Sequence, residues 1–216
     1  YLAYSLDIKG SEYFTIYVRD IKTNTFVTEE IKDTSGSIMF SLDDKFIFYS
    51  KLDENHRPRK IFRHEIGKAV KDDILIFEEK TKAFTVGIGL TSDEKYYLIT
   101  SSDHNTTEKY YFHVDEKIPE PKLIKEREKG IIYSINSWNN NFYMHTNKDA
   151  EDFKILVSKN INSNQTNILN PEIRIYNKPK TLTYEAAIKT SLIKDYYLTM
   201  SNIDRSDYYN IKFQKK

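Results

Sequence analysis

Short apolar runs separated by turn-forming residues recur along the whole chain. The stretch 35–58, SGSIMFSLDDKFIFYSKLDENHRP, serves as the template, because it holds two apolar runs, 37–41 and 46–52, joined by a tight acidic turn. A charged loop at 53–59 then leads into a third apolar run at 61–66. Runs rich in β-branched and aromatic residues and bounded by turn formers predict antiparallel β-strands.

The template unit repeats along the sequence. The strand that follows each tight turn begins at Phe46, Tyr96, Phe142 and Tyr196, which are separated by 50, 46 and 54 residues. Propeller blades repeat at intervals of roughly 40–50 residues. The sequence therefore predicts an all-β fold, an incomplete β-propeller of about five four-stranded antiparallel blades. The units are expected at approximately 1–34, 35–83, 84–129, 130–180 and 181–216.

Most of the units are expected to hold four strands. Outside the template, strands are expected at 2–6, 14–20, 26–30, 74–79, 85–90, 96–101, 109–114, 122–125, 131–137, 142–146, 153–158, 166–169, 184–190, 196–201 and 209–214. The first unit is expected to lack its innermost strand. The middle strands are continuously apolar, which indicates that neighbouring blades cover both faces. A β-sandwich is the alternative, but the four-strand repeat favours the propeller.

Composition excludes several classes of function. The 216 residues include 33 Lys and Arg against 32 Asp and Glu, so the net charge of +1 gives no case for nucleic acid or an anionic membrane as partner. No run of apolar residues is long enough to span a membrane. The absence of Cys fits a reducing compartment, so a cytoplasmic location is expected. Because Tyr1 already lies in an apolar strand, the sequence looks like a segment of a longer protein.

No catalytic nucleophile can be assigned from the sequence. A serine-hydrolase elbow needs Gly-x-Ser-x-Gly, and none of the six Gly forms that motif. Gly87 and Gly89 lie in an expected strand without the helix that follows a phosphate-binding loop. We interpret them as a packing feature where one backbone approaches another.

Titratable clusters also lack the spacing of a reactive site. The five His are not spaced as metal ligands, so we expect structural or surface roles and neither metal nor cofactor. Four adjacent acidic pairs are interpreted as solvated turn residues and not as acid–base dyads; they are Asp43-Asp44, Asp72-Asp73, Glu78-Glu79 and Asp93-Glu94. Lys interleaved with Tyr, as at 95–97 and 109–111, fits core packing better than base stacking.

The template stretch also resembles a known family. Residues 35–41, SGSIMFS, and 48–58, FYSKLDENHRP, closely resemble the oligopeptidase B branch of the prolyl oligopeptidase family. Further segments match in the same order, namely LAYSLD at 2–7, YVRD at 17–20, VGIG at 86–89, ITSSDH at 99–104 and TNKDA at 146–150. The resemblance covers residues 1 to about 160 well and 161–216 more loosely.

The resemblance implies a two-domain serine peptidase that cleaves short peptides after Arg or Lys. In that family a propeller restricts access to a separate hydrolase domain, which carries the catalytic triad. The chain is then a non-catalytic propeller segment whose partners are the missing C-terminal hydrolase domain and, in the intact enzyme, peptide substrates. A stand-alone protein-binding scaffold, or the remnant of a decayed peptidase gene, is the alternative.

Charged loops supply the candidate interface to the missing domain. The loops at 53–59, 103–108, 147–152 and 202–207 are expected on one face of the propeller. The candidate domain-interface or gating residues are Asp53, Glu54, His56, Arg57, Arg59, Asp103, His104 and Asp149. An open ring would also expose an apolar blade face and a strand edge, so self-association is expected.

Overall fold

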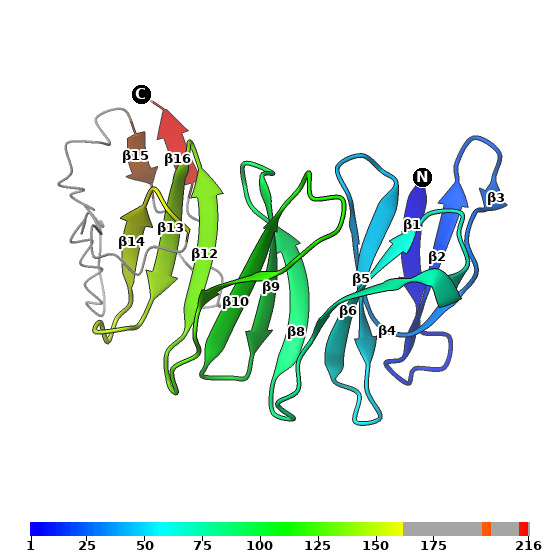
Figure 1. Ribbon diagram of the computed structural model, residues 1–216, viewed down its shortest axis with the longest axis horizontal. Coiled ribbons are helices and arrows are strands. Elements are labelled where there is room, and N and C mark those ends of the chain that lie inside the picture. The colour runs from blue at the N-terminus through cyan, green and yellow to red at the C-terminus, as the bar shows by residue number, and fades with distance from the viewer. Residues whose placement is uncertain (162–195, 200–211, 216) are drawn as a thin grey trace. The chain divides into compact units, whose positions relative to one another are not determined.

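The structure, a computed structural model, describes residues 1–161 and the strands Tyr196–Thr199 and Lys212–Lys215 (Figure 1). The described part is built of antiparallel sheets, and its helical content is a single 3-10 turn, Val70–Asp72. The predicted all-β fold of open propeller blades is confirmed. No helix in the described residues is long and apolar enough to cross a membrane.

The first two blades share one continuous sheet. Its strands are β1 (Leu2–Leu6), β2 (Phe14–Asp20), β3 (Thr25–Phe26), β4 (Ile31–Phe40), β5 (Phe46–Leu52), β6 (Pro58–Glu65) and β7 (Ile74–Glu78). They are ordered β1-β2-β4-β5-β6-β7, and β3 pairs with β2. The strands β1, β2 and β5 have the predicted bounds, whereas β6 begins three residues before the predicted 61.

Strand β4 belongs to both of these blades, which corrects two predicted strands. Its first half pairs with β2, with Ile31 opposite Ile16, and its second half pairs with β5, with Ile38 opposite Tyr49. The strand predicted at 26–30 is reduced to the two residues of β3, and the one predicted at 37–41 begins at Ile31 and ends at Phe40. The outer strand of one blade thus continues directly into the inner strand of the next.

Gly36 allows this passage between blades. It lies in the register shift between Thr34 and Ile38 and has a positive φ of 85°, which glycine adopts without steric cost. A Cβ at this position would lie 2.8 Å from the Phe14 ring. The hydroxyl of Thr34 donates to the Phe14 carbonyl at 2.9 Å, and that of Ser5 donates to the Gly36 carbonyl at 2.9 Å. The local sequence therefore fixes a bend at the blade boundary.

The third blade is a separate four-stranded sheet, ordered β11-β10-β9-β8. Its strands are β8 (Thr85–Leu90), β9 (Tyr96–Ser102), β10 (Thr107–His113) and β11 (Lys122–Lys125). The interpretation of Gly87 and Gly89 as a close backbone approach is wrong, because a Cβ at either position would have no atom within 4 Å. A residue with a side chain could therefore occupy either position without a steric clash at its Cβ.

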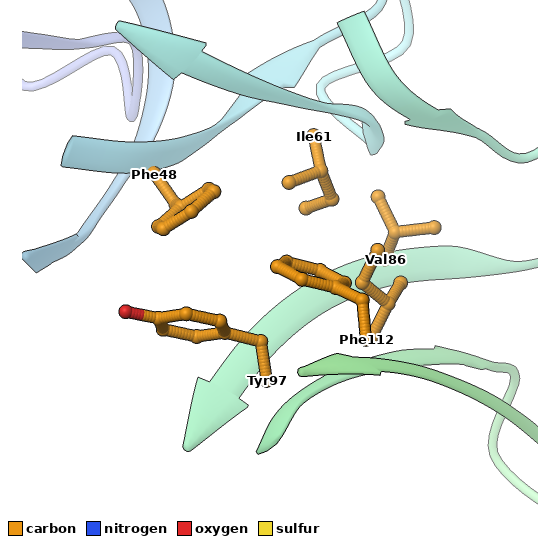
Figure 2. Packing of buried hydrophobic residues seen from close by; sticks show 6 residues of the cluster. Phe48, Ile61, Val86, Tyr97 and Phe112 are labelled. Carbon is orange, nitrogen blue, oxygen red and sulfur yellow. The ribbon is translucent and has the colours of Figure 1, made fainter. Parts of the chain in front are cut away.

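Alternate residues of β5 face opposite neighbours, which explains its unbroken apolar run. Ile47 and Tyr49 pack with Ile16 and Val18 of the first blade. Phe48 points the other way, into a cluster with Tyr97, Phe112, Ile61, Ile99 and Val86 that joins the second and third blades (Figure 2). Both faces of the strand are buried, as predicted from the sequence. Each buried apolar side chain of this size contributes about 1.5–3 kcal/mol.

The remaining strands form two further sheets. The sheet β12 (Tyr133–Trp138), β13 (Asn141–Thr146) and β14 (Lys154–Ser158) is ordered as numbered, and β15 (Tyr196–Thr199) pairs with β16 (Lys212–Lys215). The chain divides into two compact units, residues 1–132 with 136–140, and 133–135 with 141–216. The strands predicted at 166–169 and 184–190 and the loop at 202–207 lie outside the described residues.

Candidate functional site

The charged loop at 53–59 is organised by its first residue. One carboxylate oxygen of Asp53 accepts hydrogen bonds from the backbone N–H of Asn55 at 2.8 Å and of Arg57 at 3.0 Å. Burial opposes ionisation of Asp53, but these bonds lower its pKa below the usual value. His56 has a positive φ of 58°, which closes the turn. The loop therefore has one defined conformation.

Arg57 of this loop and Arg59 at the start of β6 bind the linker between the second and third blades. Arg57 donates to the carbonyls of Lys82 at 3.4 Å and Ala83 at 3.2 Å. Arg59 donates to the carbonyls of Thr81 at 2.5 Å and Phe84 at 3.4 Å, and its Nε lies 3.9 Å from Asp53. These guanidinium groups satisfy carbonyls that no sheet pairs, because residues 79–84 connect β7 to β8.

The other candidate residues have fewer contacts. Glu54 accepts a long bond of 3.4 Å from the Asn55 side chain, and the His56 ring lies 4.0 Å from the Tyr13 ring. Asp103 caps its own turn by accepting from the N–H of Asn105 and Thr106, and its pKa is lowered by these bonds.

Two candidates complete the predicted set. His104 is exposed beside Asp103 in the loop between β9 and β10. Asp149 is an exposed turn residue with φ of 52° in the second compact unit, so its position relative to the other loops is not described. Of the candidates, Asp53, Glu54, His56 and Arg57 lie between β5 and β6, Arg59 lies in β6, and Asp103 and His104 share the loop between β9 and β10.

Sequence reasoning missed a buried ionic cluster at the same end of the blades. Arg127, in the linker after β11, donates through Nη2 to Glu79 at 2.7 Å and to Glu108 at 2.5 Å, and its Nε donates to Glu108 at 3.0 Å. Its guanidinium carbon lies 4.1 Å from the centre of the Phe84 ring. Both carboxylates are buried, with exposed side-chain fractions of 4% for Glu79 and 8% for Glu108.

This cluster corrects the interpretation of Glu79 as a solvated turn residue. Burial alone would raise the pKa of Glu79, but hydrogen bonds from Arg127, Ser101 and Thr81 lower it to about 2. The two carboxylates in turn raise the pKa of Arg127. Because Glu79 follows β7, Glu108 lies in β10 and Arg127 follows β11, the cluster fastens the second blade to the third. The linker that Arg57 and Arg59 contact is therefore also bonded to Arg127.

The side chain of Asp73, also interpreted as a solvated turn residue, is only 4% exposed. One of its oxygens lies 2.6 Å from Nδ1 of His64, and the other accepts from the Tyr49 hydroxyl at 2.8 Å. Nε2 of His64 lies 2.8 Å from the Thr28 hydroxyl, and the His64 side chain is completely buried. This hydroxyl–imidazole–carboxylate arrangement resembles a catalytic triad in connectivity. Its imidazole is inaccessible to a substrate, so we assign it a structural role.

The remaining acidic pairs contain both exposed residues and one that is partly buried and hydrogen-bonded. Asp43, Asp44 and Glu94 are exposed turn residues, as interpreted from the sequence. Asp93 instead accepts from the hydroxyls of Thr91 and Ser137, which lower its pKa although burial opposes the change. In the part of the chain that the structure describes, no three His, Asp or Glu side chains group as metal ligands.

Comparison with known proteins places these features in a family. The sequence matches the family described as prolyl oligopeptidase, N-terminal beta-propeller domain, over residues 1–175. Protease 2 of Moraxella lacunata is 32% identical over 157 residues, which are 72% of this chain and 23% of the relative. Dipeptidyl aminopeptidase BI of Pseudoxanthomonas mexicana is 25% identical over 160 residues, 73% of this chain and 22% of the relative.

Solved structures give the same result for the fold. Oligopeptidase B from Trypanosoma brucei, in a closed form with covalently bound antipain, superposes with a TM-score of 0.70 and 26% identity over 78% of this chain and 24% of that protein. Oligopeptidase B from Leishmania major gives a TM-score of 0.72 with 24% identity over the same shares. The chain thus spans just under a quarter of the length of these relatives. It belongs to the prolyl oligopeptidase family and corresponds to that family's N-terminal β-propeller domain.

Proposed function

We propose that this chain is the non-catalytic propeller segment of a serine oligopeptidase that cleaves short peptides after Arg or Lys. The observation that carries the proposal is the match of residues 1–175 to the propeller domain of the family. The similarity to Protease 2 and to an oligopeptidase B that binds antipain supports the specificity for basic residues. The proposed location is the cytoplasm.

The chemistry of the chain supports a role without catalysis. Acyl transfer needs an accessible nucleophile, a base within hydrogen-bond reach and donors for the oxyanion. The sequence has no Gly-x-Ser-x-Gly elbow. The arrangement of Thr28, His64 and Asp73 has the connectivity of a triad, but its imidazole is sealed from solvent. We therefore expect the segment to hydrolyse nothing and to act by limiting access to a hydrolase domain.

The proposed contact surface for that domain is the face that carries the loops at 53–59 and 103–106. Arg57 and Arg59 bind the linker at 79–84, and Arg127 joins that linker to the third blade. Glu54 and His104 are exposed on these loops and have few internal contacts. A firm base with exposed charges fits a surface that docks loosely, because exposed ion pairs contribute only about 0–1 kcal/mol each.

The experiment that tests the function has two arms. In the first, the purified segment is incubated with an Arg-linked chromogenic substrate, with and without a serine-directed fluorophosphonate. We expect no turnover above background, and inhibitor-sensitive turnover would contradict the non-catalytic role.

In the second arm, an antibody raised against the segment is used to isolate the native protein from its source cells. We expect a species much heavier than 25.6 kDa that the fluorophosphonate labels and that cleaves the Arg substrate. An unlabelled species of 25.6 kDa would support the alternative of a stand-alone binding scaffold.

A further inference from the structure

A cavity of about 480 Å³ lies between the second and third blades, at the end of β5 opposite to the charged loop at 53–59. Phe46, Phe48, Tyr97 and Phe112 line it. The ring centres of Phe48 and Tyr97 are 4.8 Å apart, and those of Tyr97 and Phe112 are 5.1 Å apart (Figure 2). A cavity of this volume, with aromatic walls, has the dimensions of a small-molecule site, roughly 300–1,000 Å³.

Arg63, from β6, gives the cavity a buried positive charge. Its exposed fraction is 9%, and its guanidinium carbon lies 4.4 Å from the centre of the Phe46 ring. One of its N–H groups donates to the carbonyl of Lys117 at 2.6 Å. Within the described residues no carboxylate lies at ion-pair distance from Arg63, whereas the more exposed Arg127 has two. Burial accordingly lowers the pKa of Arg63, against the weaker influence of Glu65 and Asp43.

Tyr97 supplies a second donor at the same cavity. Its hydroxyl oxygen accepts a hydrogen bond from the backbone N–H of Leu42 at 3.2 Å. Over residues 1–161 no acceptor for the proton of this hydroxyl lies within hydrogen-bond distance. The side chain is 2% exposed, and a buried hydroxyl normally finds an acceptor for its proton. A ligand oxygen in the cavity would satisfy it.

Acidic side chains at the rim already have partners. Asp43 pairs with Lys45 at 3.2 Å and accepts from Ser41, and Glu116 pairs with Lys122 at 3.4 Å. Asp115 lies 3.4 Å from His113, and its side chain is 87% exposed. None of these acids lies at ion-pair distance from Arg63.

We propose that this cavity binds a small organic acid, whose carboxylate pairs with Arg63 and whose apolar group packs against Leu42, Phe46 and Val114, the more accessible apolar residues of the lining. A guanidinium matches a carboxylate because both are planar and can form two parallel hydrogen bonds. A phosphate dianion fits less well, since one guanidinium would oppose two charges beside three rim acids. An aromatic or branched aliphatic acid satisfies both the apolar walls and the charge.

The test compares an acid with its amide on the unmodified chain. The probe is 3-(4-fluorophenyl)propionate at pH 7, followed by fluorine NMR, and the matched control ligand is 3-(4-fluorophenyl)propanamide. We expect saturable binding of the acid, and at least about tenfold weaker binding of the amide, because a charge-assisted pair is lost. Inorganic phosphate should not displace the acid. Equal binding of acid and amide, or displacement by phosphate, would overturn the proposal.

Variants test the two assigned donors. Arg63→Met should weaken binding of the acid by at least about tenfold and leave the weak binding of the amide unchanged. Tyr97→Phe should weaken binding of the acid by several-fold. Lys60→Met, on the same strand, removes an exposed cation and should change nothing. If Arg63→Met loses its circular dichroism spectrum, Arg63→Lys takes its place and should weaken binding, because lysine lacks the planar fork. Full affinity in a folded Arg63 variant would refute the site.

Discussion

Arg127 holds both carboxylate oxygens of Glu108: its backbone N–H donates to Oε1 at 3.0 Å and its Nε donates to Oε2 at 3.0 Å. The same guanidinium reaches Glu79 at 2.7 Å. One side chain in a linker therefore joins the end of the second blade to a central strand of the third. Because the cation satisfies two buried carboxylates, its loss should cost more than the loss of a surface ion pair.

Replacement of Arg127 should weaken the contact between the second and third blades. Arg127→Met keeps the apolar stem but leaves Glu79 and Glu108 buried without a counter-charge. We expect the free energy of unfolding to fall by about 2–4 kcal/mol, which is below the full penalty for a buried pair because Arg127 is partly exposed. Denaturant titration followed by circular dichroism measures the change. Lys129→Met, at an exposed position of the same linker, is the control, and an equal loss in both variants would contradict the role of Arg127.

The same cluster predicts how stability depends on pH. The pKa of Glu79 is about 2 in the folded protein against 4.5 as the reference value, and that of Glu108 is also lowered. A depressed carboxyl pKa stabilises the fold fully above the unfolded pKa, and this contribution is lost as the pH falls through the folded pKa. Stability should therefore decline between pH of about 5 and 2. Glu79→Gln should flatten this decline, and an unchanged slope in the variant would refute the assignment.

The pattern of strands was predictable because each strand is a local run of apolar residues. The bounds of Phe14–Asp20, Phe46–Leu52 and Thr85–Leu90 agree with the prediction for that reason. The continuation of β4 across two blades was not predictable, because its first half contains polar residues whose pairing with β2 depends on the bend at Gly36.

The ionic cluster escaped prediction for a different reason. Glu79, Glu108 and Arg127 are far apart in the sequence, and each lies among other charged residues. Nothing local distinguishes Glu79 from the exposed Glu78 beside it, or Asp73 from the exposed Asp72. Only the stacking of blades determines which of these acids is removed from water.

Gly36 should tolerate no side chain. Gly36→Ala would place a Cβ in contact with the Phe14 ring and hold a non-glycine residue at positive φ, so we expect a loss of about 2–4 kcal/mol in the free energy of unfolding. Gly87→Ala is the matched control, because a Cβ there meets nothing within 4 Å. It should be neutral or stabilise by up to about 1 kcal/mol. Thermal denaturation measures both variants, and equal shifts of their midpoints would contradict the requirement for glycine at position 36.

The outer face of the first blade should drive self-association. Tyr4 stacks on Tyr17 at 5.4 Å on this face, and Leu2 and Leu6 beside them are 49% and 46% exposed. The outer edge of β1 has no strand partner in the described residues. Light scattering on a size-exclusion column should show a mass above 25.6 kDa that rises with concentration. Leu6→Lys should shift the population to monomer, whereas Ile118→Lys, an equally apolar exposed position in the third blade, should not.

The loop at 53–59 is the place to test the proposed gate, in the full-length peptidase to which we propose that this chain belongs. Asp53 and Arg57 shape the loop and bind the linker, so a change in either also disturbs the base of the loop. Glu54 is exposed and accepts one long hydrogen bond, so Glu54→Lys reverses a charge on the proposed docking face at the cost of that single weak contact. Because exposed pairs contribute about 0–1 kcal/mol, KM for peptides should change by up to about fivefold at an unchanged melting temperature.

Arg57→Glu should change both KM for peptides and the melting temperature, since it also releases the carbonyls of Lys82 and Ala83. Lys68→Glu provides the control, because this exposed residue follows β6 and lies at the opposite end of the blade. Its kinetics should match those of the unmodified enzyme on both short and longer peptides. If Glu54→Lys and Lys68→Glu behave alike, the loop face does not govern access of peptides to the hydrolase domain. A change confined to longer peptides in Glu54→Lys would instead place the loop at the opening through which they pass.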